Sequence, residues 1–193
     1  MAKIIGKYFI ALVPEGEVLK EATKVKEDLM DKFGLKYALK SPAHVTLKMP
    51  FSWNEAKEKD LIDRIRDFSS NNESFNLHLK GFGKFGNRVI FIKVRPNPKL
   101  IFLQSSLAEF CKRELKLVKE LSDSNYHPHM TVAFKDIKAK HFDEYWEYVN
   151  KLHFDQKVKF EKLVLLKRKE GRWYPLSELA LGDKPKDDGA DLI

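Results

Sequence analysis

The tetrapeptide His44-Val45-Thr46-Leu47 recurs in kind as His129-Met130-Thr131-Val132, 85 positions further along the chain. The chain has only three threonines and six histidines, so two such pairs would rarely arise by chance. Alternate residues of a β-strand share a face, so each histidine should lie beside its threonine, with hydrophobic residues on the opposite face. We therefore expect two strands that each present an imidazole and a hydroxyl, and one functional site assembled from two halves of the chain.

Outward from these motifs, the sequence alternates between strand and helix patterns. Strands are expected at 8–13, 44–49, 75–82, 88–94, 129–134, 154–167 and 173–179, with Pro50 ending the first motif strand. Hydrophobic residues at helical spacing predict helices over 15–33, 54–68, 100–117 and 140–151. This order predicts an α+β fold in which helices cover the outer faces of antiparallel sheets. We expect a single domain over residues 1–180 and a disordered tail at 181–193, which has little to bury.

Composition narrows the class of protein. The 193 residues are 43% hydrophobic and 33% charged, which is ordinary for a soluble globular chain. No apolar run reaches the length of a membrane span, no signal peptide is evident, and a single cysteine cannot form an internal disulfide, so we expect a cytoplasmic protein. A net charge of +8 raises the local concentration of polyanions and modestly favours an RNA or nucleotide partner. No obligate protein partner is evident.

The paired residue types point to a kind of chemistry. Imidazole is the side chain that gives and takes protons near neutral pH, and two of them across a cleft can act as base and acid. Hydroxyls beside them, at Thr46 and Thr131, could hold phosphate oxygens. We therefore expect a phosphodiester reaction without metal or cofactor, with a 2′,3′-cyclic phosphate as a good substrate. His44 and His129 are its expected catalytic residues.

Other interpretations and other residues remain open. His127 and His129 could form a metal site with His44 in a metal-dependent hydrolase, and the basic charge also allows a non-catalytic RNA-binding module. Lys48 should share a face with His44 and could approach a phosphate, although a solvated lysine is equally consistent. Two flanking aromatic residues could stack on a base, but packing is the simpler role for both, Tyr126 and Phe51.

The two motifs, together with His127-Pro128, resemble the paired signature of the 2H phosphoesterase superfamily, which contains the 2′-5′ RNA ligase-like proteins and the RNA cyclic phosphodiesterases. Further support comes from Phe9-Ile10-Ala11-Leu12-Val13-Pro14 and from Arg88-Val89-Ile90-Phe91-Ile92. The resemblance covers about residues 5 to 180.

This resemblance implies a bilobed α+β fold, with two antiparallel sheets flanking a central groove and a duplicated unit in each half. It implies metal-independent hydrolysis of cyclic phosphates, with 2′-5′ RNA ligation as the reverse reaction. His44 and His129 would be the acid–base pair, and Thr46 and Thr131 the phosphate holders. RNA 3′ ends, small cyclic nucleotides and ADP-ribose cyclic phosphate all stay open as substrates, and so does the choice of acid and base.

Overall fold

The computed structural model describes residues 3–118 and 120–182. Its strands are β1 (Ile5–Leu12), β2 (Val45–Asn54), β3 (Phe75–Phe85), β4 (Val89–Val94), β5 (His129–Phe134), β6 (Asp155–Phe160), β7 (Lys162–Lys169) and β8 (Arg172–Ala180). Its α-helices are α1 (Gly16–Phe33), α2 (Glu58–Ser70), α3 (Pro98–Arg113), α4 (Leu121–Ser124) and α5 (Phe142–Asn150). Short 3-10 helices are η1 (Tyr37–Lys40), η2 (Glu55–Lys57) and η3 (Ala139–His141).

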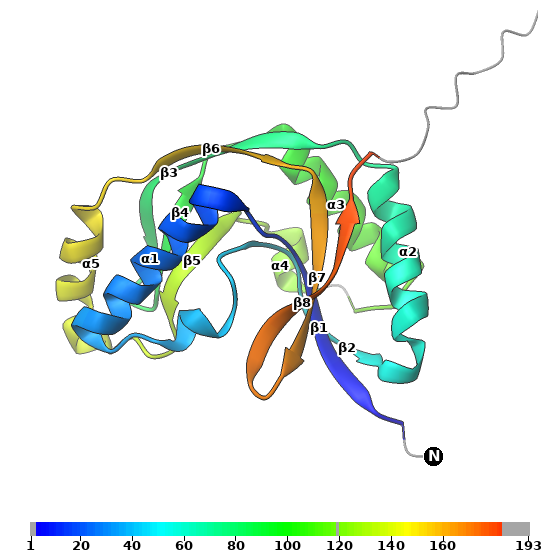
Figure 1. Ribbon diagram of the computed structural model, residues 1–193, viewed down its shortest axis with the longest axis horizontal. Helices are drawn as coiled ribbons and strands as arrows, with labels where there is room; N and C mark the ends of the chain where they lie inside the picture. The colour runs from blue at the N-terminus through cyan, green and yellow to red at the C-terminus, as the bar shows by residue number, and fades with distance from the viewer. Residues whose placement is uncertain (1–2, 119, 183–193) are drawn as a thin grey trace, which may run out of the picture.

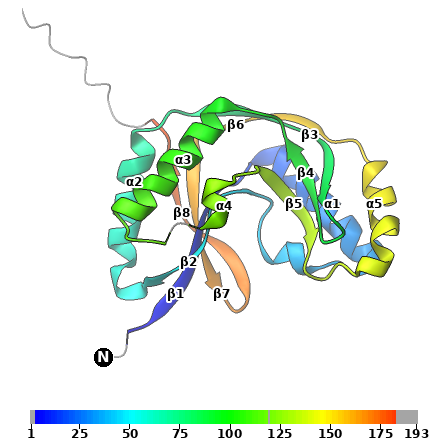
Figure 2. The ribbon, with the colours of Figure 1, turned by 180° about the vertical axis from the view of Figure 1, so that it is seen from behind.

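The strands form two antiparallel four-stranded sheets, with the orders β2-β1-β7-β8 and β5-β4-β3-β6. Helices α2 and α3 lie against the first sheet, while α1 and α5 cover the second (Figures 1 and 2). The predicted α+β fold, with two lobes and helices on their outer sides, is confirmed.

A repeated strand–helix–strand unit relates the two lobes. In one half, β1 and β2 are neighbours joined through α1, and in the other half β4 and β5 are neighbours joined through α3. Each connecting helix crosses to the opposite lobe, since α1 contacts β5 and α3 contacts β2. The crossings tie the lobes together, and they leave both motif strands, β2 and β5, at sheet edges.

The hydrophobic pattern explains why the strand predicted over 154–167 is wrong as a single element. The chain leaves one sheet at the end of β6 and enters the other with β7. The second half of β6 alternates between exposed and more buried positions, whereas β7 contains a continuous apolar run, 163–166, that is buried throughout. This change from alternation to a continuous run marks the crossing between lobes.

Three other boundaries differ from the predictions. Strand β2 does not end at Pro50 but continues to Asn54, which an edge strand permits because a proline there need not donate to a neighbour. Asn54 caps η2 rather than a long helix, accepting a hydrogen bond from the Ala56 amide at 3.2 Å. Helix α3 ends at Arg113 rather than at residue 117, and α4 follows it as a separate short helix.

The structure describes only the first two residues, 181 and 182, of the tail predicted to be disordered. Leu181, the first residue of the predicted disordered tail, is buried, and its amide donates to the Glu161 carbonyl at 2.8 Å. Residues 183–193 of that tail lie outside the described residues. None of the helices in the described ranges is long and apolar enough to cross a membrane. The cytoplasmic location stays a prediction.

Candidate functional site

The site begins with the two motif strands, β2 and β5, which lie at sheet edges and contact each other between the lobes. The predicted alternation is confirmed on both. The main core buries the four hydrophobic residues of the motifs: Val45, Leu47, Met130 and Val132. The intervening histidines and threonines keep exposed surface. The apolar faces therefore fix the strands and leave the polar side chains free for chemistry.

Both imidazoles are held in the same way. The Nδ1 atom of His44 lies 2.7 Å from the Pro42 carbonyl oxygen, and the Nδ1 atom of His129 lies 2.7 Å from the His127 carbonyl oxygen. A carbonyl only accepts, so in the neutral ring Nδ1 carries the proton and donates it. Each Nε2 is then left as an unprotonated nitrogen that can accept a proton and, once protonated, deliver it.

Each imidazole also packs against a phenylalanine of the neighbouring strand. The ring centroids of Phe9 on β1 and His44 are 4.9 Å apart, and those of Phe91 on β4 and His129 are 5.1 Å apart. Phe85 adds an edge-to-face contact with His129 at 4.9 Å. These packing roles were not predicted from the sequence, although the Phe-Ile dipeptide occurs twice, as Phe9-Ile10 and Phe91-Ile92, before each motif.

A glycine makes room for one of these rings. An added Cβ at Gly83 on β3 would lie 2.5 Å from Cε2 of Phe91, which is closer than real Cβ contacts come. The ring of Phe91 therefore lies over a strand position that tolerates no side chain. This packing fixes the ring on which His129 rests.

Burial keeps both imidazoles neutral. Desolvation lowers the pKa of His44 to about 4, against the hydrogen bond to the Pro42 carbonyl, which raises it. Positive charge on Lys26, and on His129 when that ring is protonated, lowers it a little further. Protonation of His129 would therefore disfavour protonation of His44 across the lobes. Desolvation also lowers the pKa of His129, against the hydrogen bond to the His127 carbonyl, which raises it. At neutral pH both rings can therefore accept a proton.

A cavity of about 450 Å³ opens between the motif strands. Its lining residues come from β2, from the end of β3 and from the segment before β5, and they are Thr46, Leu47, Met49, Phe85, Ser122, Asp123, Asn125, Tyr126, His127 and His129. The cavity thus joins a hydroxyl from one motif to the imidazole of the other. His44 and Thr131 do not line it.

Lys48 departs from its predicted face. An irregularity in the pairing of β1 with β2 leaves Leu47 unpaired between Thr46, opposite Ala11, and Lys48, opposite Ile10, so Lys48 turns into the interior. There its ammonium lies 2.5 Å from Asp123 and donates to the Val118 carbonyl at 3.2 Å. The expectation that Lys48 shares a face with His44 is wrong, and contact between Lys48 and a phosphate is disfavoured because the charge is already paired.

The two flanking aromatic residues have structural partners. The Tyr126 hydroxyl donates to the Thr46 carbonyl at 2.9 Å, so the residue joins the segment before β5 to β2 while lining the cavity. Phe51 is buried against Tyr8, with ring centroids 6.1 Å apart. Base stacking by either residue stays a prediction.

The alternative metal site lacks a three-ligand geometry. Over residues 3–118 and 120–182, no three His, Cys, Asp or Glu side chains come together closely enough to hold a metal ion. This includes the proposed set His44, His127 and His129. The ring of His127 instead lies 3.1 Å from the Asn125 carbonyl.

Two antiparallel sheets whose facing edge strands carry matched His-x-Thr motifs define the class of two-histidine phosphoesterases. The chain matches the 2′-5′ RNA ligase superfamily over residues 14–172, and it belongs to that family. The resemblance stated from the motifs is confirmed at the level of the superfamily.

Relatives and solved structures agree with this membership. A protein of Geobacillus sp. (strain WCH70) that carries the name of a phosphoesterase is 26% identical over 94% of this chain and 99% of its own length. A Bacillus cytotoxicus protein of the same kind is 35% identical over 55% of this chain and 59% of its own length. TT0787 of Thermus thermophilus has a similar structure, with a TM-score of 0.69 and 19% identity over 93% of this chain and 100% of its own length. E. coli LigT in apo form has a TM-score of 0.63 and 20% identity, covering 92% and 98% of the two chains. At these identities the structural likeness concerns the fold.

Proposed function

We propose that this protein is a phosphodiesterase that hydrolyses 2′,3′-cyclic phosphates by metal-independent acid–base catalysis, with His44 and His129 as the two proton-transfer groups. The observation that carries the proposal is the matched setting of the two imidazoles. Each lies at the start of an edge strand, two residues before a threonine, with Nδ1 held by the carbonyl two residues earlier. This symmetry is what a displacement at one phosphorus needs, because one face receives a proton donor and the other a proton acceptor.

In the proposed reaction, His44 is the base. Its low pKa leaves Nε2 neutral, so it can take a proton from water as the water oxygen attacks phosphorus. As that P–O bond forms, the bond from phosphorus to one ribose oxygen breaks, and His129 protonates the departing oxygen. The product is a phosphomonoester with a free neighbouring hydroxyl. In 2′-5′ ligation the 5′-hydroxyl of an RNA would take the place of water, His44 would accept its proton, and His129 would protonate the departing 3′ oxygen. We expect hydrolysis to be the main reaction.

Thr46 and Thr131 are proposed to hold the non-bridging phosphate oxygens. Each follows its histidine by two positions on the same strand face, and Thr46 lines the cavity together with His129. Neutral hydroxyl donors can stabilise the charge that develops on these oxygens. Replacing either by valine keeps the shape and removes the donor. We expect both kcat and kcat/KM to fall in Thr46→Val and Thr131→Val.

Structural neighbours support a nucleotide substrate. Structures of E. coli LigT, which has a similar fold, have been solved with 3′-AMP, ATP and phosphate. Each of these ligands carries the phosphate group that the proposed site would hold. The basic charge of this chain is compatible with such ligands as well as with RNA ends.

The direct test incubates purified protein, in the presence of EDTA, with 2′,3′-cyclic mononucleotides, RNA oligomers ending in a 2′,3′-cyclic phosphate, and ADP-ribose cyclic phosphate. The proposal predicts that at least one is opened to a monoester at an undiminished rate. Activity that disappears on chelation would instead identify a metal-dependent hydrolase. RNA binding without any turnover would identify a non-catalytic binding module and end the proposal.

A further inference from the structure

A second pocket, which we call the η1 pocket, lies beside the residues that hold His44. It has a volume of about 580 Å³ and is formed by α1, η1, the segment leading to β2, and the start of β8. The side chains on which the argument rests are Lys26, Glu27, Lys36, Lys40, Arg172 and Trp173. Four of these six are cationic and one is acidic, so the pocket has an excess of positive charge.

Lys26 is the unusual member of this set. Its side chain is 2% exposed, and its ammonium donates to the carbonyls of Ala38 and Ser41, each at 3.1 Å. Within the described part of the chain, no carboxylate forms an ion pair with it. Buried cations are costly unless they are paired, so a buried cation without a carboxylate partner, in a pocket lined by further cations, is a place where a bound anion would be stabilised. Glu27 is the acidic side chain in the same lining.

The pocket borders residues that hold the His44 ring in place. Ser41 and Pro42 line it, and the Pro42 carbonyl is the one that holds the His44 ring at 2.7 Å. Trp173 lines it too and packs edge-on against Phe9, with centroids 4.8 Å apart. Phe9 in turn contacts His44. A ligand held in the η1 pocket would therefore lie against residues that position the His44 ring.

The positive charge extends past the rim of the pocket. The ammonium groups of Lys40 and Lys135 each lie 4.7 Å from the centroid of the Tyr37 ring, and Lys135 also donates to its hydroxyl at 3.0 Å. These cations, with Arg168, lower the pKa of Tyr37. The nearby carboxylate of Asp136 is partly compensated, because it accepts the backbone amides of residues 36 and 37 at 2.8 and 2.7 Å.

We propose that the η1 pocket binds a second phosphate of a single-stranded RNA, on the His44 side of the phosphate that reacts. The inference rests on the proposed function for its substrate class, and it selects RNA over a mononucleotide, which has no second phosphodiester to place there. The aromatic side chains of the partly exposed Trp173 and the exposed Tyr174 could stack on the adjoining bases.

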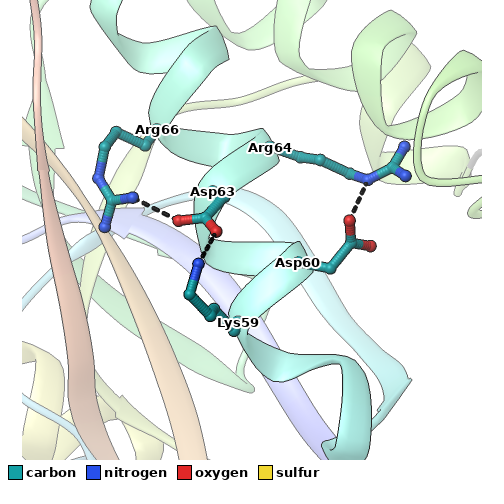
Figure 3. A network of polar contacts seen from close by, with 5 residues as sticks. All are labelled: Lys59, Asp60, Asp63, Arg64 and Arg66. Carbon is teal, nitrogen blue, oxygen red and sulfur yellow. Dashed lines mark hydrogen bonds and ion pairs between the residues drawn. The ribbon is translucent and has the colours of Figure 1, made fainter.

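The test compares two substrates in one pair of variants. Lys40→Gln/Arg172→Gln should lower kcat/KM for an RNA hexamer ending in a 2′,3′-cyclic phosphate by about tenfold, and leave a 2′,3′-cyclic mononucleotide unchanged. The matched control is Lys59→Gln/Arg66→Gln, which removes two exposed charges from α2 (Figure 3). The control should leave kcat/KM unchanged for both substrates. Equal losses on both substrates, or none on either, would overturn the inference.

A binding measurement keeps this inference separable from the proposed reaction. Fluorescence anisotropy with a hexamer carrying an ordinary 3′-phosphate needs no turnover. Log affinity should fall linearly with log salt, and the slope should shrink by about 0.7, the value for one phosphate of a single strand, in Lys40→Gln/Arg172→Gln and stay unchanged in the control. Lys26→Met, which keeps the buried stem, should weaken binding as well. If these variants bind the hexamer as the wild type does, the pocket is not an RNA site.

A competition experiment distinguishes a strand phosphate from the free ion. Inorganic phosphate is titrated against the bound hexamer at constant ionic strength. An RNA site predicts that millimolar phosphate displaces little of the hexamer, because several contacts along the strand act together. Complete displacement at micromolar phosphate would show a free-anion site instead and contradict the assignment.

Discussion

His44 and His129 are matched in orientation by their backbone hydrogen bonds, and they are made neutral by the same cause. In both, removal from water disfavours the charged ring and lowers the pKa. A neutral imidazole can act as a base without any prior change of protonation. An acid must acquire its proton, which a bound phosphate anion favours because opposite charge raises the pKa of a histidine. We therefore expect the bound substrate to raise the pKa of His129, so that this histidine carries the proton that the acid must donate.

The pH dependence of kcat/KM follows from these directions. We expect a bell-shaped profile whose acid limb reports His44, with a pKa near 4, and whose alkaline limb reports His129, below its usual 6.5. The corresponding limbs of kcat should lie at higher pH, because substrate raises both values. Steady-state kinetics on a cyclic phosphate across the acid and neutral range measures this. A free-enzyme alkaline limb well above the ordinary histidine pKa would contradict the assignment of His129 as the acid.

The same burial links His44 to stability. The folded-state pKa of about 4 lies below the ordinary 6.5, so between these values the unfolded chain binds more protons than the folded one. The free energy of unfolding should therefore fall as pH drops from 6.5 toward 4, with His44 contributing up to ~3 kcal/mol. Urea denaturation at several pH values measures the slope. His44→Gln should flatten it, and an unchanged slope would show that the ring is already solvated.

At the scale of single residues, sequence reasoning could find the motif but not its supports. A histidine and a threonine two positions apart share a strand face whatever surrounds them, so the alternation alone was sufficient. Phe9, Phe91 and Lys26 act through contacts between distant segments, which spacing does not encode. Lys48 was misplaced because an irregularity in β2 inserts one extra residue and turns it from the predicted face.

Among the elements, the segment that leads into β5 is held in place by Lys48, which the irregularity in β2 turns inward. Lys48 and Asp123 are each 2% exposed at their side chains and pair at 2.5 Å, and Tyr126 adds its bond to the Thr46 carbonyl. Asp123 also accepts the Glu120 amide and caps α4. These contacts fix the approach of the chain to His129 against the strand that carries the other motif.

Breaking this buried pair should be costly. Lys48→Met leaves the Asp123 carboxylate buried without its cation, so we expect a loss of about 3–5 kcal/mol in the free energy of unfolding. Urea denaturation measures it. The double variant Lys48→Met/Asp123→Leu should recover much of the loss, since it removes both charges. A single-variant cost below ~1 kcal/mol would show the pair behaves like an exposed one.

The β3–β4 hairpin supports His129 through Phe91. Gly83→Ala places a methyl group 2.5 Å from that ring, so overpacking should lower the free energy of unfolding by about 1–3 kcal/mol. We also expect a clear drop in kcat, because the displaced Phe91 ring no longer supports His129. Gly86→Ala is the matched control, because it has positive φ but no atom within 4 Å. It should cost stability alone. Equal kcat in the two variants would disconnect Phe91 from the site.

For the whole molecule, the sequence predicted the class of fold and the convergence of the motifs, but not the path of the chain. The crossing between β6 and β7 passes through one unbroken strand-like stretch, and its change of pattern was visible only once both sheets were known. The exchange of α1 and α3 between lobes depends on packing partners that are distant along the chain. Local periodicity describes which face of a helix is apolar, and not which sheet it will cover.

The central claim is that one phosphate is handled by two motifs acting as a unit. The most direct measurement is kcat on a 2′,3′-cyclic phosphate for His44→Ala, His129→Ala and the double variant. Positioned acid–base groups contribute about 10²–10⁴ each, so each single variant should lose that much. The double variant should fall little below the worse single one, because residues of one catalytic unit are not additive. Losses that multiply in the double variant, or a single variant that turns over normally, would contradict the account.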